Sequence, residues 1–307
     1  MTTLSSRIEL TDFFSETADP ALLESADRGQ TELLDYRQLY ELWERQQWLT
    51  QELDFSVDRD HWHGFPDEER FQRMYGLSSF FIGEQKVTEE LGPMMRAAPT
   101  QDMQVFLATQ IADEARHVRF FDRFYAEVGV LASDDLAARL KETEKHLNPA
   151  FNVLFDEMLG ARVRTLAEDP TNMVALVEAI TLYHMVIEGM LALTGQHFII
   201  DFNEREGTLP GFVRGFNLVA RDEHRHVAFG ARFLRDAVSE DPAYKEVIQR
   251  TLAEALEIAD AVLKPPWAQD QPEDYEFFGV SIDDTRDFAA QALTRRLKVI
   301  GLVPAAA

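Results

Sequence analysis

One five-residue pattern occurs twice in this chain, and it limits the possible folds more than any other feature. Residues 113–117 read Asp-Glu-Ala-Arg-His, and residues 222–226 read Asp-Glu-His-Arg-His. Each copy contains Glu-x-x-His, and residues three apart on a helix lie on nearly the same face, one turn apart. A single copy is common on solvated helices, but two copies inside apolar segments indicate a metal site between helices. The candidate pairs are Glu114 with His117 and Glu223 with His226.

A bundle site of this kind also needs one carboxylate from each of two further helices. Glu188 lies in a very apolar segment, and no other acidic residue lies between Glu178 and Asp201. Glu84 follows an apolar run, although other glutamates come soon after it. In each half a single glutamate precedes the Glu-x-x-His motif, by 30 residues in the first half and 35 in the second. The sequence therefore predicts four helices whose six side chains hold two metal ions.

The remaining sequence predicts an all-α fold, because apolar residues recur at helical spacing and alternating strand patterns are almost absent. Asp283 and Asp284 resemble a helix N-cap region. Proline-bearing breaks have the character of loops, so we expect one domain over residues 1–307, with 1–30 as a flexible N-terminal segment. Helices are expected near 31–50, from Pro66 onward, and over 77–96, 101–129, 150–167, 171–202, 211–238, 243–264 and 284–299.

Charge and composition exclude several classes of function. The chain has 30 Lys and Arg against 54 Asp and Glu, a net charge of −24, which disfavours nucleic acid and anionic membranes as partners. No apolar run reaches the length of a bilayer span, and the N-terminus lacks the pattern of a signal peptide, so we expect a cytoplasmic protein. There is no cysteine, so a metal site must use His, Asp and Glu, which suit Fe, Mn or Zn.

The motifs resemble the ribonucleotide reductase small-subunit superfamily, which has a ferritin-like fold, and within it the R2-like ligand-binding oxidases. The similarity extends from about Trp48 to Gly230. The segment WLTQELDFSVDRDHW is similar to the entry segment of these proteins, and GEQKVTE, DEARH, Y-x-x-x-x-EGMLALTG and RDEHRH are similar to their four ligand helices. One departure is Gln85, where the family often has a second glutamate.

The resemblance implies an O₂-activating oxidase that carries out a two-electron oxidation on a bound hydrophobic ligand such as a long-chain fatty acid. It implies a Mn/Fe or Fe/Fe centre, and the sequence does not choose between them. In that family manganese takes the site of the first-half ligands, here Glu84, Glu114 and His117. A homodimer is also implied. A tunnel for the ligand would be lined by aromatic residues of the later helices: Phe198, Phe212, Phe216 and Phe229.

Two further residues match the oxidases. In them, a valine three residues after the first glutamate becomes joined by an ether bond to a tyrosine five residues before the third, and these positions are Val87 and Tyr183. Five residues turn an ideal α-helix through about 500°, so Tyr183 and Glu188 would point apart. We therefore predict a π-type distortion near 183–188, because such bulges realign faces at functional sites.

The resemblance also assigns outer partners to the metal ligands. Asp222 would accept a hydrogen bond from a ligand histidine and link it to Trp48, and that pair would feed electrons inward. On sequence grounds alone, Trp48 could equally well be a residue that simply packs in the core.

Two other functions are compatible with the same ligand set. One is a reductase small subunit, but Phe121 occupies the position four residues after His117 where such subunits often carry a radical tyrosine. The last tyrosine is Tyr275, so the C-terminal tail lacks a relay tyrosine. The other is a metal-storage or ligand-carrier protein, and nothing in the sequence points to the shell that storage needs.

Overall fold

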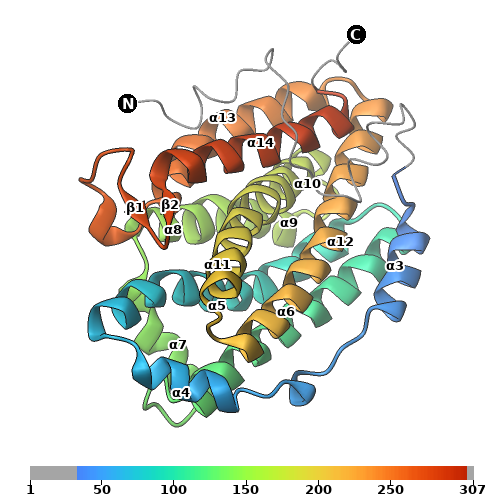
Figure 1. The fold of residues 1–307 in the computed structure, drawn as a ribbon. Coiled ribbons are helices and arrows are strands. Elements are labelled where there is room, and N and C mark those ends of the chain that lie inside the picture. The colour runs from blue at the N-terminus through green and yellow to red at the C-terminus, as the bar shows by residue number, and fades with distance from the viewer. Residues whose placement is uncertain (1–32, 303–307) are drawn as a thin grey trace.

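The computed structural model describes residues 33–302, in which four long helical segments form the centre of a bundle. Helix α5 (Asp67–Ala97) packs on α6 (Gln101–Val128), and the segment η4 (Thr181–Ala192) packs on α12 (Pro210–Glu240). Figure 1 shows α5, α6 and α12 running through the body of the molecule, with α11 (Leu193–Glu206) between them in the view. Helices α5, α6 and α12 and the segment η4 carry the predicted metal ligands.

Local sequence signals set the ends of the core helices. The Thr100 side chain accepts a hydrogen bond from the backbone N–H of Met103 and caps the start of α6. Gly129 ends that helix with a φ of +78°, a left-handed conformation that favours glycine. Helix α5 follows Pro66 and begins with three acidic residues, which interact favourably with the positive end of the helix dipole.

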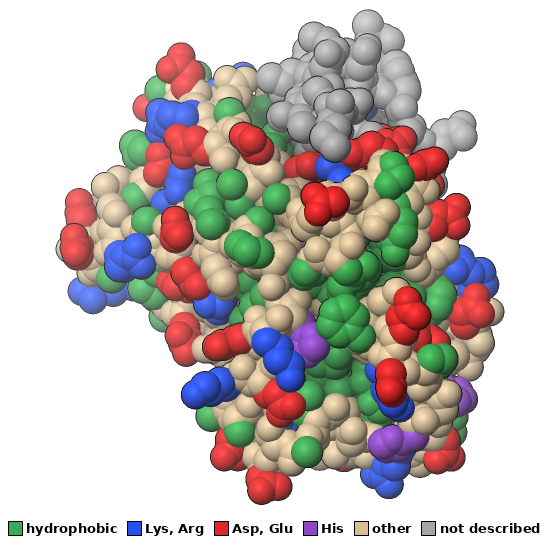
Figure 2. Space-filling view, turned by 90° about the vertical axis from the view of Figure 1, so that its left-hand side faces the viewer, with side chains coloured by type: hydrophobic (Ala, Val, Ile, Leu, Met, Phe, Trp, Pro, Cys, Tyr) green, Lys and Arg blue, Asp and Glu red, His purple; other side chains and the backbone are tan. Residues whose placement is uncertain are grey.

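The other elements surround this centre. Figure 1 shows α13 and α14 side by side along one edge, while the strands β1 and β2 form an antiparallel hairpin in which Glu276 lies opposite Ser281. In Figure 2, hydrophobic side chains gather in the middle of the face that carries this hairpin, with charged side chains around them. The bounds are α3 (Tyr36–Arg45), η1 (Thr50–Glu52), α4 (Ser56–Gly64), α7 (Leu136–Thr143), η2 (Glu144–His146), α8 (Pro149–Asn152), η3 (Val153–Leu159), α9 (Gly160–Glu168), α10 (Met173–Ile180), α13 (Tyr244–Leu263), η5 (Pro266–Ala268), β1 (Glu276–Phe277), β2 (Val280–Ser281) and α14 (Ile282–Ile300).

The predicted all-α fold is confirmed, and several details differ; the helices α4 and α7, for example, were not predicted. The helix expected from Pro66 and the helix expected over 77–96 are one continuous helix, α5, since no break separates them. The β1–β2 hairpin was not predicted, because two-residue strands are too short to show alternation. Ser281, rather than Asp283 or Asp284, caps α14, because its side chain accepts from the backbone N–H of Asp284. The expectation for residues 1–30 lies outside the described residues.

The predicted helical distortion is also confirmed. The chain from Thr181 to Ala192 is a π-helix, flanked by α10 and α11 without a break in direction. A second π-helical stretch, η3, was not predicted.

The expectation that no apolar run reaches the length of a bilayer span needs correction. The continuous helical stretch Met173–Glu206 is long and apolar enough to cross a membrane by length and composition. However, 83% of its most apolar window is buried inside the bundle, as in the core helix of a globular protein.

Candidate metal centre

The structure brings all six predicted ligands together at the centre of the bundle. Glu84 comes from α5, Glu188 from η4, and each Glu-x-x-His pair from α6 or α12. All six side chains are buried. They form two groups, in each of which one ligand atom per residue lies within 4.8 Å of the others. The first group is Glu84, Glu114, His117 and Glu223, and the second is Glu114, Glu188, Glu223 and His226.

Glu114 and Glu223 belong to both groups, so they are the carboxylates placed to bridge two ions. Glu114 directs Oε2 to His117 Nδ1 at 3.4 Å and Oε1 to His226 Nδ1 at 3.2 Å. Glu223 contacts the same two nitrogens, with Oε1 3.4 Å from His117 Nδ1 and Oε2 3.2 Å from His226 Nδ1. Glu188 joins only the second group, and Glu84 only the first.

The protonation equilibria of the cluster reflect an excess of buried negative charge. Burial raises the pKa of Glu188 to about 8, and the nearby Glu223 carboxylate adds to this shift. Burial also raises the pKa of Glu84 well above its usual range. Burial alone would lower the pKa of His117 and of His226, but the surrounding carboxylates outweigh it and raise both well above the usual value. The metal-free site therefore holds protons where cations would bind.

The donor set fits two divalent or trivalent ions. Four glutamates carry a charge of −4 when ionised, and two divalent ions would balance it. Glu188 Oε2 is buried and has no hydrogen-bond partner among the described residues, as expected for an oxygen that binds a cation. Oxygen and imidazole ligands suit iron and manganese.

The predicted outer partners Asp222 and Trp48 are in place, and the histidine that they support is His117. His117 Nδ1 faces the carboxylates, and its Nε2 lies 3.3 Å from Asp222 Oδ2. The same aspartate oxygen accepts a hydrogen bond from the indole N–H of Trp48 at 2.7 Å. Both Trp48 and Asp222 are buried, and the opposing charges and hydrogen bonds keep the pKa of Asp222 low in spite of its burial.

A second set of outer partners mirrors the first and was not predicted. His226 Nε2 lies 3.2 Å from Asp113 Oδ2, and Trp43 donates its indole N–H to Asp113 Oδ1 at 2.9 Å. Each aspartate precedes the motif glutamate on one helix and contacts the histidine of the other helix. The repeated Asp-Glu at 113–114 and 222–223 was the available signal.

Two arginines from the same motifs join these aspartates. Arg225 Nη2 donates to Asp113 at 2.9 Å and to Asp222 at 2.8 Å. Arg116 forms ion pairs with the same two aspartates, at 2.9 Å in the case of Asp222. The arginine that precedes the histidine in each motif thus stabilises the carboxylates that orient the histidines.

Val87 and Tyr183 are both buried beside the cluster. They line the same cavity as Glu84 and Glu188. The Tyr183 hydroxyl donates to Glu114 Oε1 at 2.8 Å. Gln85, in contrast, points to Glu89, with its Nε2 2.6 Å from Glu89 Oε1, so it is not part of the cluster.

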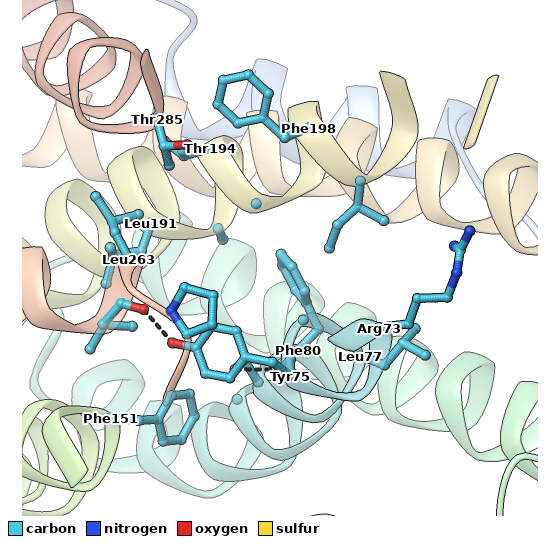
Figure 3. Close-up of a pocket in the computed structure, with 18 of the residues that line it drawn as sticks. Arg73, Tyr75, Leu77, Phe80, Phe151, Leu191, Thr194, Phe198, Leu263 and Thr285 are labelled. Carbon is cyan, nitrogen blue, oxygen red and sulfur yellow. Dashed lines mark hydrogen bonds between the residues drawn. The ribbon is translucent and has the colours of Figure 1, made fainter. Parts of the chain in front are cut away.

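An apolar cavity extends from the cluster towards the surface. Four of its wall residues are Glu84, Glu114, Glu188 and Glu223, and most of the rest are aromatic or aliphatic. Figure 3 shows Leu191 and Leu263 at one end of this cavity and Arg73 at the other. Of the four aromatic residues expected along a tunnel, Phe198 and Phe212 line the cavity, whereas Phe216 and Phe229 pack in the core outside it.

Phe121 lies in an aromatic cluster. Its ring centroid is 5.0 Å from that of Phe120 and 5.8 Å from that of Phe216, and its side chain is fully buried. Its phenyl ring has no hydroxyl, so this position cannot hold a phenoxyl radical.

Comparison with known proteins gives a consistent result. The family model "Ribonucleotide reductase, small chain" matches residues 31–305. Among solved structures, a variant of an R2-like ligand-binding oxidase with an aerobically reconstituted Mn/Fe cofactor is 26% identical. The match covers 89% of this chain and 95% of that one, with a TM-score of 0.76. A second variant, with an anaerobically reconstituted Mn/Fe cofactor, is 26% identical over 89% and 94% of the chains, with a TM-score of 0.75.

Proposed function

Because the chain belongs to the ribonucleotide reductase small-chain family, we propose that it is a dinuclear metal oxidase that uses O₂ for the two-electron oxidation of a bound hydrophobic ligand. The ligand we propose is a long-chain fatty acid. The similar oxidases carry Mn/Fe cofactors, and the buried carboxylate and histidine cluster described above suits two such ions. The proposed ligands are the six residues of that cluster.

The observation that carries the proposal is the position of the apolar cavity. It ends on the glutamates of the cluster, so a molecule in it has an apolar body beside apolar walls and one end at the metals. A carboxylate at that end could bind the ions, while the hydrocarbon chain would gain free energy from leaving water. The position of this cavity therefore favours an oxidase with an apolar ligand over a storage protein.

When bound, the two ions supply the redox chemistry of O₂ activation. The residues of the chain orient the ligands and exclude water. Asp222 and Asp113 hold the imidazoles of His117 and His226 with Nδ1 towards the cluster. The cavity walls keep the site apolar, and Val87 and Tyr183 line the same cavity as the glutamates of the cluster.

The reductase alternative is less well supported. A reductase small subunit stores a radical or passes one to a partner through tyrosines, and Phe121 has no hydroxyl. We also propose that the protein is a homodimer, that it is cytoplasmic, and that its centre holds either Mn/Fe or Fe/Fe. Light scattering would test the first, and anomalous scattering at the manganese and iron edges the last.

The function is tested with purified full-length protein. Solvent extraction followed by mass spectrometry should yield a long-chain fatty acid, and the metal-loaded protein should consume O₂. Peptides that contain Val87 and Tyr183 should become joined, with the loss of two hydrogens, only after exposure to oxygen. If both peptides remain free and no apolar ligand is found after full oxidation of the metals, the reductase alternative is favoured.

A further inference from the structure

Gln110 is a buried amide that contacts three residues of the π-helix. It lies on α6, one turn before Glu114, and has no exposed surface. Its Nε2 lies 3.1 Å from the Tyr183 hydroxyl and 2.9 Å from Glu188 Oε1. Its Oε1 lies 3.2 Å from Nε2 of His184. One side chain therefore joins two candidate functional residues and a histidine outside the metal cluster.

The chemistry of the neighbours fixes the orientation of this amide. The Tyr183 hydroxyl donates its one hydrogen to Glu114, so its oxygen accepts from Gln110 and the amide NH₂ must face it. The amide oxygen then faces His184 and needs a donor there. Burial lowers the pKa of His184 to about 3, so the ring is neutral and has one N–H, and the amide oxygen opposite Nε2 favours the tautomer with the hydrogen on that atom. Both amide hydrogens are thus directed at Tyr183 and Glu188.

Close packing holds His184 in this position. A Cβ on Gly230 of α12 would lie 2.2 Å from the Cβ of His184 and 2.7 Å from its Cγ. A Cβ on Gly189 would lie 2.7 Å from the His184 carbonyl oxygen. Real side-chain atoms do not approach so closely, so glycine at these positions leaves the room that His184 occupies.

The π-helix makes the double contact of Gln110 possible. Tyr183 and Glu188 are five residues apart, and the i→i+5 pattern of a π-helix places such residues one above the other. The Tyr183 oxygen is held from two sides, since it accepts from Gln110 and donates to Glu114. Tyr183 and Val87 line the same cavity.

We propose that Gln110, held by His184, is a positioning residue that fixes the Tyr183 oxygen for bond formation with the Cβ of Val87. This inference rests on the proposed function. In the reaction the Tyr183 O–H and the Val87 Cβ–H bonds break and a C–O bond forms. Two protons and two electrons leave and are taken up by O₂, the oxidant, for which the bound ions would supply the redox chemistry. The Gln110 N–H stabilises the negative charge that develops on the phenol oxygen as its proton leaves.

The first test compares Gln110→Met with a matched control. Methionine keeps the length and flexibility of glutamine but has no N–H to donate. The control is Gln196→Met, because Gln196 is another buried glutamine, and neither polar atom of its amide has a partner among the described residues. After anaerobic loading with two ions per chain, oxygen is added and the joined Val87–Tyr183 peptide is followed by mass spectrometry. Cross-linking should slow roughly 100-fold in Gln110→Met and remain as in the wild type in the control.

A second readout does not depend on metal or on turnover. Ultraviolet resonance Raman spectra of the metal-free proteins, each minus the spectrum of Tyr183→Phe, report the hydrogen bonds of the Tyr183 phenol. Loss of the Gln110 donor should change the phenol from a donor and acceptor to a donor only. Gln110→Glu, which keeps the shape of the side chain and places an acceptor opposite the phenol, should give the same change if Gln110→Met does not fold.

The two readouts separate the inference from the proposed function. A wild-type protein that binds two ions and never forms the joined peptide would refute the proposed cross-link, and the Raman result would still decide whether Gln110 fixes the phenol. An unchanged phenol spectrum in the folded variants would overturn the inference. Equal cross-linking rates in the wild type and Gln110→Met would overturn it as well.

Discussion

Replacing Glu188 by glutamine should reduce the pH dependence of the stability of the metal-free protein. Burial raises the pKa of this carboxyl from 4.5 to about 8, so the folded state keeps a proton that the unfolded chain has already released. The stability that this proton provides is fully present below about pH 4.5 and is lost as the pH rises towards 8. Glutamine is neutral at every pH in this range and cannot show the effect.

The structure sets the size of the change. A shift from 4.5 to about 8 corresponds to roughly 5 kcal/mol as an upper limit, because each pKa unit is worth about 1.4 kcal/mol. The shift depends partly on Glu223. The pH-dependent loss of stability should therefore be smaller in the variant by only a share of this amount. The raised pKa values of Glu84, His117 and His226 act with the same sign, since all three groups lose protons less readily in the folded state. The wild type should therefore lose stability from pH 5 to pH 8, and Glu188→Gln should lose less.

The assay is urea unfolding of the metal-free proteins at pH 5, 6, 7 and 8. Glu178→Gln is a suitable control, because Glu178 lies on α10 outside the cluster, with Oε1 paired to Arg250 at 2.8 Å. The control should keep the slope of the wild type. Loading with metal should reverse the trend in the wild type, because ions replace the protons. A metal-free wild type whose stability is constant or rises from pH 5 to pH 8 would refute the reasoning.

Further predictions concern the metals and their supports. Elemental analysis should find two transition-metal ions per chain, iron with manganese or iron alone, and a content of zinc only would contradict the site. His226→Ala should weaken one ion far more than the other in competition titrations, and simultaneous loss of both with unfolding would show that the two half-sites are wrongly assigned. Trp43→Phe and Trp48→Phe should each lower the affinity for one ion roughly tenfold, because each removes a donor from an orienting aspartate; equal effects on both ions would argue against separate supports. Gly230→Ala should cost about 1–3 kcal/mol in urea unfolding through overpacking, whereas Gly92→Ala, whose Cβ meets nothing within 4 Å, should be neutral or stabilising.

The sequence was sufficient to predict most of the helices and the assembly of the candidate ligands. Charged residues repeated at helical spacing in apolar segments are costly to bury unless a cation or a charged partner compensates them, and the structure brings all six together. The π-helix could be predicted because Tyr183 and Glu188 would otherwise face apart. These predictions depended on spacing within one helix, which the sequence contains directly.

Contacts between distant segments were harder to predict. The shared positions of Glu114 and Glu223 depend on how α6 and α12 face each other, so the sequence left the bridging carboxylates open. Trp43 is 70 residues from Asp113, and no local pattern relates them. Gln110 looks like an ordinary polar residue until its neighbours from η4 are known.

The crossed arrangement of aspartates and histidines has a consequence for how the protein matures. His117 on α6 is oriented by Asp222 from α12, and His226 on α12 by Asp113 from α6. Neither helix alone contains a complete support for its own histidine, so the two halves of the chain must dock in register before either ion is held firmly. Metal uptake is then a late event that follows assembly of the whole bundle. A nascent chain that has not yet synthesised α12 would be protected from binding iron in a half-formed and reactive site.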